Sequence, residues 1–79
     1  MTNRDIGARV QGLRQELGMT TTRLAERIGI SQAQVSRLEN GLQGFRSTTL
    51  MKIAKALGKE PFYFLMTDAQ WKAYERSAK

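Results

Sequence analysis

The chain has 79 residues, and 13 Lys and Arg against 7 Asp and Glu give it a net charge of +6 and an isoelectric point near 10.3. It has no Cys and no His, which excludes disulfides, thiolate nucleophiles, Cys/His zinc sites and His-based triads. A domain this small buries only ~60% of the surface of its unfolded chain, so a partner subunit would help it. No apolar run approaches the ~20 residues of a membrane span, and the first residues lack the apolar core of a secretory signal. We therefore expect a cytoplasmic protein.

The positive charge is the other clue from composition. A small basic domain attracts polyanions, and nucleic acid is the commonest of these. Solubility alone is the alternative explanation of the charge, so a nucleic-acid partner has to be argued from the arrangement of the residues.

Apolar residues recur at helical spacing, and no stretch alternates polar and apolar residues long enough to predict a strand. The first stripe has spacings of four, three and four residues: Ile6, Val10, Leu13 and Leu17. It predicts a helix over about 4–17 that Gly18 ends. Thr20 to Thr22 supply hydroxyl caps for a short helix over about 21–28, which ends at Gly29.

The turn Gly29-Ile30-Ser31, whose serine is a good helix cap, leads into another short helix over about 32–40. Val35 and Leu38 give this helix a narrow buried stripe. Its other positions are small, amide-bearing or cationic, and Asn40-Gly41 end it. A tight Gly-containing turn sets two helices at a steep angle, so that the second one projects outward.

Residues 42–47 are predicted as a loop, and Ser47 or Thr48 as the cap of a fourth helix that Gly58 ends. The apolar positions of this helix are Leu50, Ile53, Ala54 and Leu57. Pro61 suits the first turn of a fifth, very apolar helix over Phe62–Met66. The sequence therefore predicts an all-α fold of five helices with a possible sixth.

The possible sixth helix runs from Asp68 to about Ser77, with Trp71 and Tyr74 three residues apart. Five consecutive large apolar residues, Phe62 to Met66, cannot all face inward from one helix. Either Trp71 and Tyr74 cover them from the tail or a second subunit does. The two alternatives are compatible, because a paired tail helix would do both.

The second of the two short helices, over about 32–40, suits the major groove of B-DNA, which is ~12 Å wide and accepts one α-helix. A helix that enters it needs apolar anchors behind and hydrogen-bonding residues in front. Val35 and Leu38 are the predicted anchors. The predicted readers of base edges are Gln32, Ser36 and Arg37.

The stretch from Leu24 to Gly41, with Gly29 in its turn and Glu39-Asn40-Gly41 at its end, closely resembles the helix-turn-helix of the Cro/cI-type (XRE) family of DNA-binding transcriptional regulators. The likeness covers about residues 4–66, includes Ile53 to Gly58 in the fourth helix, and weakens in the last dozen. It implies a phage-repressor-like helix-turn-helix DNA-binding domain over residues 1–66. Residues 67–79 remain as a helical tail for dimerisation or partner contact.

The resemblance also implies which residues contact DNA. Base contacts are implied for Gln32, Ala33, Ser36 and Arg37. Gln pairs bidentately with adenine and Arg with guanine, each worth ~1–3 kcal/mol of discrimination. Phosphate contacts are implied for Thr20, Thr21, Gln34, Asn40 and Arg46. The alternatives are a solvated helix face for the glutamines and Arg37, a tolerated small residue at Ser36, a mere helix cap at Asn40-Gly41 and a solvated loop charge at Arg46.

Two further features follow from the resemblance. Arg14 and Glu39 match a structural pair that bridges the first helix to the end of the recognition helix. The family commonly has Gln in place of Thr21, and that Gln often braces the first recognition Gln. Since Thr21 is shorter, it is not expected to brace Gln32 in the same way.

In this family the late helices commonly form a two-fold dimer contact. The residues implied for such an interface are Phe62, Tyr63, Met66, Trp71 and Tyr74. Arg4, Arg9, Arg23, Arg27 and the Lys residues are expected to be mostly solvated.

The function implied is sequence-specific DNA binding by a homodimer on a two-fold-symmetric operator, with half-sites ~34 Å apart, and occlusion or recruitment of polymerase. We expect no enzymatic activity, metal or cofactor, because the carboxylates are scattered and no Gly-rich stretch forms a phosphate-cradling loop. A small-molecule ligand is not expected, since the chain has little room for a sensor domain. The alternatives are a restriction-modification controller, an antitoxin that also binds a toxin, and a domain used only for protein contact.

Overall fold

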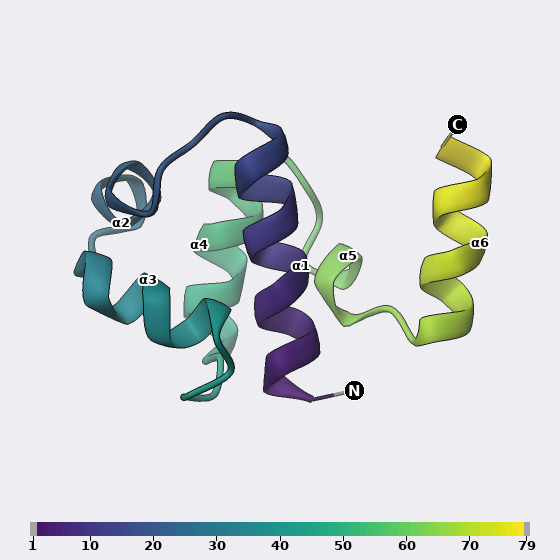
Figure 1. Cartoon of the computed structure of the whole chain (residues 1–79), viewed down its shortest axis with the longest axis horizontal. Coiled ribbons are helices and arrows are strands. Elements are labelled where there is room, and N and C mark those ends of the chain that lie inside the picture. The colour runs from purple at the N-terminus through teal and green to yellow at the C-terminus, as the bar shows by residue number, and fades with distance from the viewer. Residues whose placement is uncertain (1, 79) are drawn as a thin grey trace.

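The chain forms six α-helices in a computed structural model that describes residues 2–78 (Figure 1). In chain order they are α1 (Asn3–Glu16), α2 (Thr21–Ile28), α3 (Gln32–Glu39), α4 (Ser47–Leu57), α5 (Phe62–Leu65) and α6 (Asp68–Ala78). The predicted all-α class is confirmed, and the possible sixth helix is present. Within the described residues, no helix combines the length and the apolarity needed to cross a membrane.

Local capping explains where the first helices begin. Thr2 accepts a hydrogen bond from the Asp5 backbone N–H, and the Asp5 carboxylate accepts one from the Thr2 N–H, so α1 begins one residue earlier than predicted. The hydrogen bond from the Thr2 backbone N–H, and after it the interaction with the Thr2 hydroxyl, lower the pKa of the Asp5 carboxyl. At α2, Thr20 accepts from the Arg23 N–H at 3.0 Å. The predicted start of α2 is therefore confirmed.

Two predictions about helix ends are wrong. Leu17, which was predicted on the buried stripe of the first helix, is its C-cap and is 53% exposed, because α1 already ends at Glu16. The cap of α4 is Arg46, in an extended conformation and without a side-chain hydrogen bond. Ser47 and Thr48 are exposed residues of the first turn, because the chain becomes helical before either could act as the cap.

The core lies between the first five helices. Its largest fully buried side chains are Val10, Leu24, Val35, Ile53 and Phe64. They come from α1, α2, α3, α4 and α5 respectively, so one close-packed cluster joins these five helices. α3 is thereby anchored from behind by the rest of the domain.

Gly7 sets how closely α1 approaches the end of α3. A Cβ at Gly7 would overlap the backbone carbonyl oxygens of Leu38 and Glu39, so the two helices touch through their backbones here. Glycine is needed at this position for its lack of a side chain and not for its backbone freedom. This role of Gly7 was not predicted from the sequence.

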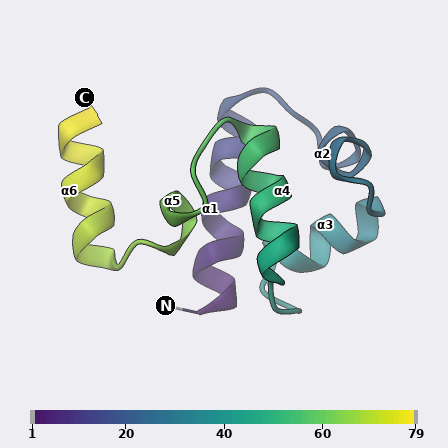
Figure 2. The ribbon, with the colours of Figure 1, turned by 180° about the vertical axis from the view of Figure 1, so that it is seen from behind.

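The helices divide into two groups on either side of α1. Figure 1 shows α2 and α3 on one side and α5 and α6 on the other, and Figure 2 shows α4 from behind, between these groups. The molecule measures 33 × 24 × 18 Å along its principal axes. Because α6 lies on the side away from α3, the C-terminal tail does not cover the predicted recognition helix.

Candidate nucleic-acid interface

The turn between α2 and α3 is built by local hydrogen bonds. Gly29 adopts a left-handed conformation with φ 74°, and the N–H groups of Gly29 and Ile30 both donate to the carbonyl oxygen of Ala25. Ser31 then accepts from the Gln34 N–H at 3.1 Å while the Gln34 side chain accepts from the Ser31 N–H at 2.9 Å. This capping box starts α3 directly after the turn, as the sequence predicted.

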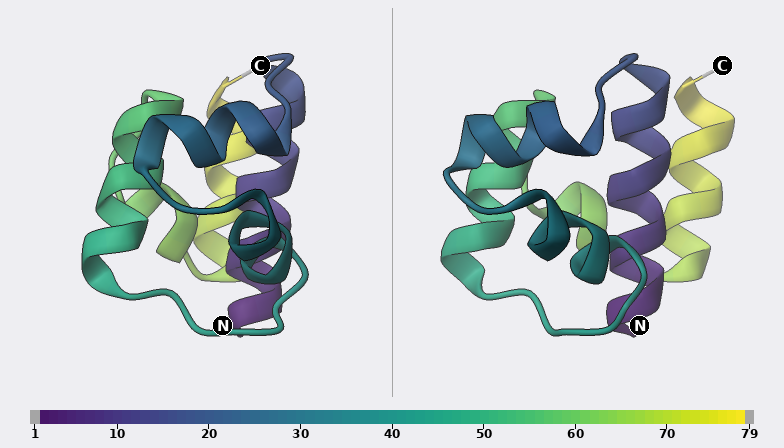
Figure 3. Two further views of the ribbon diagram at one scale, coloured as in Figure 1. Left: turned by 90° about the vertical axis from the view of Figure 1, so that its left-hand side faces the viewer. Right: turned by 60° about the vertical axis from the view of Figure 1, so that its left-hand side comes forward.

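The inner face of α3 is anchored and its outer face is open. Val35 and Leu38 are each 2% exposed, which confirms them as the apolar anchors. The implied base-contacting residues are Gln32, Ala33, Ser36 and Arg37; three of them are exposed and Ser36 is half-buried. Positions one turn apart share a helix face, so all four lie on one side of α3. With the left-hand side of Figure 1 turned to the viewer, α3 stands in front of α1, and α6 lies behind them (Figure 3).

Gln32 is braced by Thr21, contrary to the expectation from the sequence. Its Nε2 donates a hydrogen bond to the Thr21 Oγ1 at 3.1 Å. The expectation was wrong because it compared side-chain lengths alone. The steep turn brings the first residues of α2 and α3 close together, so a threonine reaches the glutamine.

Arg37 also has a partner, and this contact was not predicted from the sequence. Its Nε–H donates to the Oε1 of Gln43 at 3.0 Å. Gln43 belongs to the loop between α3 and α4, where no periodicity or cap marks it in the sequence. Both long side chains implied for base contact are therefore held by a neighbour from outside α3.

The residues implied for phosphate contact lie around α3 in three places. Thr20 and Thr21 are at the N-terminal end of α2. Gln34 and Arg46 line one hollow of about 300 Å³ between α3 and the start of α4. Asn40 is at the C-terminal end of α3.

Two of these residues also have structural contacts. Gln34 closes the capping box of α3, and the Asn40 side-chain Nδ2 donates to the Ser36 carbonyl oxygen at 2.8 Å. Asn40 is the C-cap of α3, which agrees with the cap that the sequence predicts there. Such bonds fix the directions of both amides before any ligand arrives.

Arg14 and Glu39 form the structural pair that the resemblance implies. The Arg14 Nε and Nη2 donate to the two carboxylate oxygens of Glu39 at 2.7 and 3.0 Å, and the side chains are 9% and 2% exposed. The Arg14 Nη1 donates to the Met19 carbonyl oxygen at 2.7 Å. One guanidinium therefore joins α1, the α1–α2 loop and the end of α3.

A family model described as Helix-turn-helix matches residues 10–64, a span that includes α2, the turn and α3. The chain belongs to the helix-turn-helix family of the XRE type. The resemblance found in the sequence is thereby confirmed. The curated relatives described next are named as transcriptional regulators and not as enzymes.

Two curated relatives illustrate the similarity of this helix-turn-helix chain. The transcriptional repressor RghR of Bacillus subtilis (strain 168) is 41% identical over 64 residues, which are 80% of this chain and 47% of RghR. The uncharacterised regulator y4wC of Sinorhizobium fredii is 36% identical over 74 residues, which are 92% of this chain and 52% of y4wC. The chain thus spans about half the length of these relatives.

Solved structures share the fold of this helix-turn-helix chain. ClgR, the clp gene regulator of Corynebacterium glutamicum, matches with a TM-score of 0.82 and 27% identity over 99% of this chain and 83% of ClgR. The P22 c2 repressor, solved with a synthetic operator, matches with a TM-score of 0.71 and 25% identity over 75% of this chain and 89% of the repressor.

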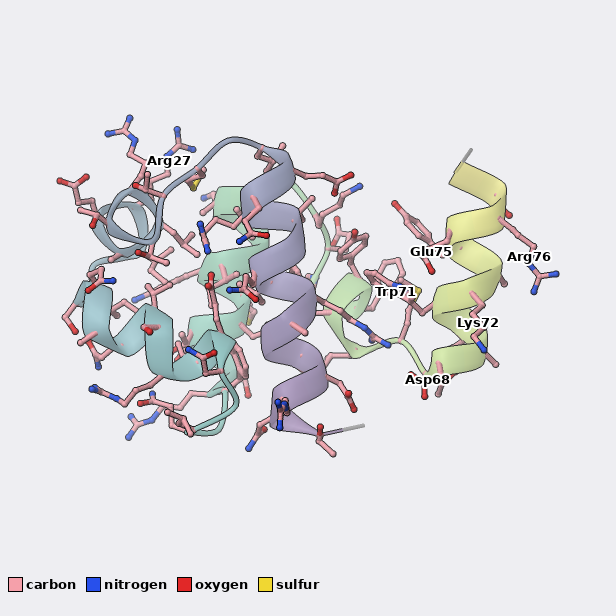
Figure 4. All side chains as sticks on the ribbon, in the orientation of Figure 1. Arg27, Asp68, Trp71, Lys72, Glu75 and Arg76 are labelled. Carbon is pink, nitrogen blue, oxygen red and sulfur yellow. The ribbon has the colours of Figure 1, made fainter. Side chains whose placement is uncertain are left out.

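At the opposite end of the helix-turn-helix domain, Arg9 joins α1 to α5 and α6. It was expected to be solvated, but its side chain is only 9% exposed. Its guanidinium donates to the carbonyl oxygens of Phe64 and Met66, lies 3.6 Å from the Asp68 carboxylate and stacks 4.4 Å above the Trp71 ring. Figure 4 shows Trp71 between α6 and the rest of the molecule, whereas Arg76 points away.

Lys59, also expected to be solvated, is half-buried and contacts α6. Its Nζ donates to the Tyr74 hydroxyl at 3.1 Å, and this hydrogen bond raises the pKa of Lys59. Tyr63 contacts the rings of Trp71 and Tyr74 edge-on, with centroids 5.0 and 5.3 Å away, and burial raises its pKa. α6 therefore covers Tyr63, one of the two arrangements that the sequence left open.

The residues implied for a dimer interface differ in exposure. Phe62 is 62% exposed, and its neighbour Leu65 on α5 is 47% exposed, so the tail leaves both uncovered. Tyr63, Trp71 and Tyr74 are half-buried against one another. Met66 is only 7% exposed and is buried in its own chain, so its side chain presents no surface to a partner.

Proposed function

We propose that this chain is a sequence-specific DNA-binding transcriptional regulator that acts as a homodimer on a two-fold-symmetric operator. The observation that carries the proposal is the open outer face of α3. Its four implied base-contacting residues are accessible from one side, while Val35 and Leu38 anchor the helix from behind. A helix held in this way suits insertion into a major groove.

Base reading is supported by the chemistry of Gln32 and Arg37. A glutamine amide matches the N6 and N7 groups of adenine, and a guanidinium matches O6 and N7 of guanine. Ala33 supplies a methyl group that suits contact with a thymine methyl. Each of these two side chains also has a hydrogen-bond partner outside α3, Thr21 for Gln32 and Gln43 for Arg37.

Phosphate contact is supported by the placement of polar groups on both sides of α3. Thr20 and Thr21 lie at the N-terminus of α2, where the helix dipole favours anions. Gln34 and Arg46 line the hollow beside α3, and Asn40 lies at its far end. The net charge of +6 favours any polyanion over a neutral surface.

Dimerisation is supported by the uncovered apolar residues of α5. Phe62 and Leu65 are largely exposed, and the half-buried cluster of Tyr63, Trp71 and Tyr74 continues their surface. This surface lies on the side away from α3, so a second copy docked there would leave both recognition helices free (Figure 1).

A protein partner is a second candidate occupant of the same surface. SinR was solved in complex with SinI, and PlcR was solved with the peptide PapR7 and DNA. Both proteins share this fold. The exposed apolar side chains of Phe62 and Leu65 would suit an apolar surface of a protein or peptide partner, a toxin included, as well as a second copy of the chain. Co-purification of a chain encoded next to this one would favour the partner over the homodimer.

Selection of bound sites from a random pool of double-stranded DNA tests the proposal. We expect enrichment of a palindromic motif with half-sites ~34 Å apart, or a multiple of that spacing. The matched control is Gln32→Ala, which removes one reader from the surface of α3 and should flatten one position of each half-site. A wild-type chain that binds every sequence alike would contradict base reading, and an unpaired half-site would contradict the dimer.

A further inference from the structure

The hydrogen bond between Arg37 and Gln43 joins an exposed side chain of α3 to a half-buried side chain of the following loop. Exposed pairs of long side chains usually contribute little, because ordering both of them costs entropy. A defined contact of this kind requires a backbone that already places the two residues beside each other.

The backbone of the α3–α4 loop provides that placement. The Leu42 N–H donates to the carbonyl oxygen of Arg37 itself at 2.9 Å, and the Gly41 N–H donates to the Leu38 carbonyl oxygen at 3.2 Å. Gly41 has a φ of 73°, and a Cβ there would lie 2.7 Å from the Arg4 Cα. The loop is thus bonded to the last turn of α3 and pressed against α1, which carries Gln43 alongside Arg37.

We propose that Gln43 is a positioning residue that determines base specificity through Arg37. This inference rests on the proposed DNA-binding function and assigns a second residue to one of its base contacts. Gln43 fixes the direction of the guanidinium and does not itself read a base.

The hydrogen bond to Gln43 determines which part of the Arg37 guanidinium is available to a base. Arginine has five N–H donors in a planar fork and can present either the edge with Nε or the end with the two Nη atoms. Gln43 already accepts from the Nε–H. The two Nη groups remain, so Arg37 meets the O6 and N7 acceptors of guanine end-on.

The same bond lowers the entropic cost of binding. Arginine is among the side chains that lose most rotamer freedom when they are fixed. An Arg37 that is already held in the free protein loses less on contact with guanine, which is the general effect of preorganisation. A loosely held Arg37 would reach alternative acceptors, including phosphate oxygens, and would discriminate less between base pairs.

The test compares the base preference of variants by site selection, followed by binding to sites changed at single positions. Gln43→Met keeps the size of the side chain and removes the acceptor, whereas Gln43→Glu keeps an acceptor for the Nε–H. Gln15→Met is the matched control, because Gln15 is an exposed glutamine on α1, outside the interface. Thermal unfolding of each variant checks that the fold is retained.

We expect Gln43→Met to lose about tenfold in discrimination at the base pair that Arg37→Ala also flattens, and at no other position. Gln43→Glu should keep the motif while its added charge weakens binding to all sites alike. In the Arg37→Ala background, Gln43→Met should change nothing further.

The inference is overturned if Gln43→Met retains the complete motif, or if it weakens binding uniformly, as loss of a phosphate contact would. Failure of the proposed function is a different result, in which the wild-type chain itself selects no motif and both proposals fall together. Failure of this inference alone leaves the wild-type motif, and its dependence on Arg37, in place.

Discussion

Arg14 on α1 and Glu39 at the end of α3 form a bidentate ion pair with hydrogen bonds of 2.7 and 3.0 Å, and both side chains are almost completely buried. Within the described residues no buried side-chain nitrogen or oxygen is without a hydrogen bond. The pair therefore fixes the recognition helix to the domain without leaving an unsatisfied group. Replacing one member of a buried ion pair is costly, because the other charge stays buried without a partner.

Glu39→Leu should destabilise the fold by ~3–5 kcal/mol, because it leaves the buried Arg14 guanidinium without its carboxylate. Urea unfolding followed by circular dichroism measures the loss. The control is Glu26→Leu on α2, an exposed residue whose replacement should change the stability by less than about 0.5 kcal/mol. Equal effects of the two substitutions would show that the pair contributes nothing specific.

Gly7→Ala should destabilise the fold by ~1–3 kcal/mol, because the new Cβ overlaps the Leu38 and Glu39 carbonyl oxygens and forces α1 and α3 apart. Gly12→Ala in the same helix is the control. A Cβ at Gly12 meets nothing within 4 Å, so this change should be neutral or stabilising by up to ~1 kcal/mol. Thermal unfolding distinguishes the two, and a Gly7→Ala chain as stable as the Gly12→Ala chain would contradict the close approach.

Arg46→Ala should weaken DNA binding by a similar factor for all sequences and reduce the slope of log affinity against log salt by about one, because the side chain is proposed to neutralise a phosphate. Titrations at several salt concentrations measure this slope. Arg27→Ala on α2 removes an exposed charge outside the proposed contacts and serves as the control. A loss confined to one base pair would instead make Arg46 a reader of bases.

Phe62→Ser should weaken the proposed homodimer without unfolding the chain, because the side chain is 62% exposed and contributes little to the core. Analytical ultracentrifugation over a range of concentrations measures the association. Leu42→Ser is the control, since Leu42 is 74% exposed in the α3–α4 loop, on the side away from α5. A wild-type chain that stays monomeric at high concentration would remove the dimer from the proposal.

Much of the helix-turn-helix could be predicted because it depends on interactions between neighbouring residues. The caps at Thr20 and Ser31 bond to groups three residues ahead, and Gly29 ends α2 through its own backbone conformation. The burial of Val35 and Leu38 follows from helical spacing. The pair of Arg14 and Glu39 lay beyond this local reach and was implied only by the family resemblance.

Other features depend on how separate segments meet. The contacts of Gln32 with Thr21 and of Arg37 with Gln43 arise where a turn or loop folds back, and side-chain length alone misjudged the first of them. The charge of Arg9 in the sequence suggested solvation, although α5 and α6 bury it. A residue's type does not reveal which distant backbone carbonyl or ring will lie beside it.

The sequence by itself determined five helices and the possibility of a sixth, their ends to within a residue or two, and the face that α3 offers to solvent, because hydrogen bonding and apolar spacing along a helix act over three or four residues. Only the tertiary structure decided that Gly7 must lack a side chain, that Met66 is buried while Phe62 is not, and that both long side chains on the outer face of α3 have hydrogen-bond partners outside the helix. These outcomes depend on contacts between segments distant along the chain, and such contacts are set by the packing of the whole core.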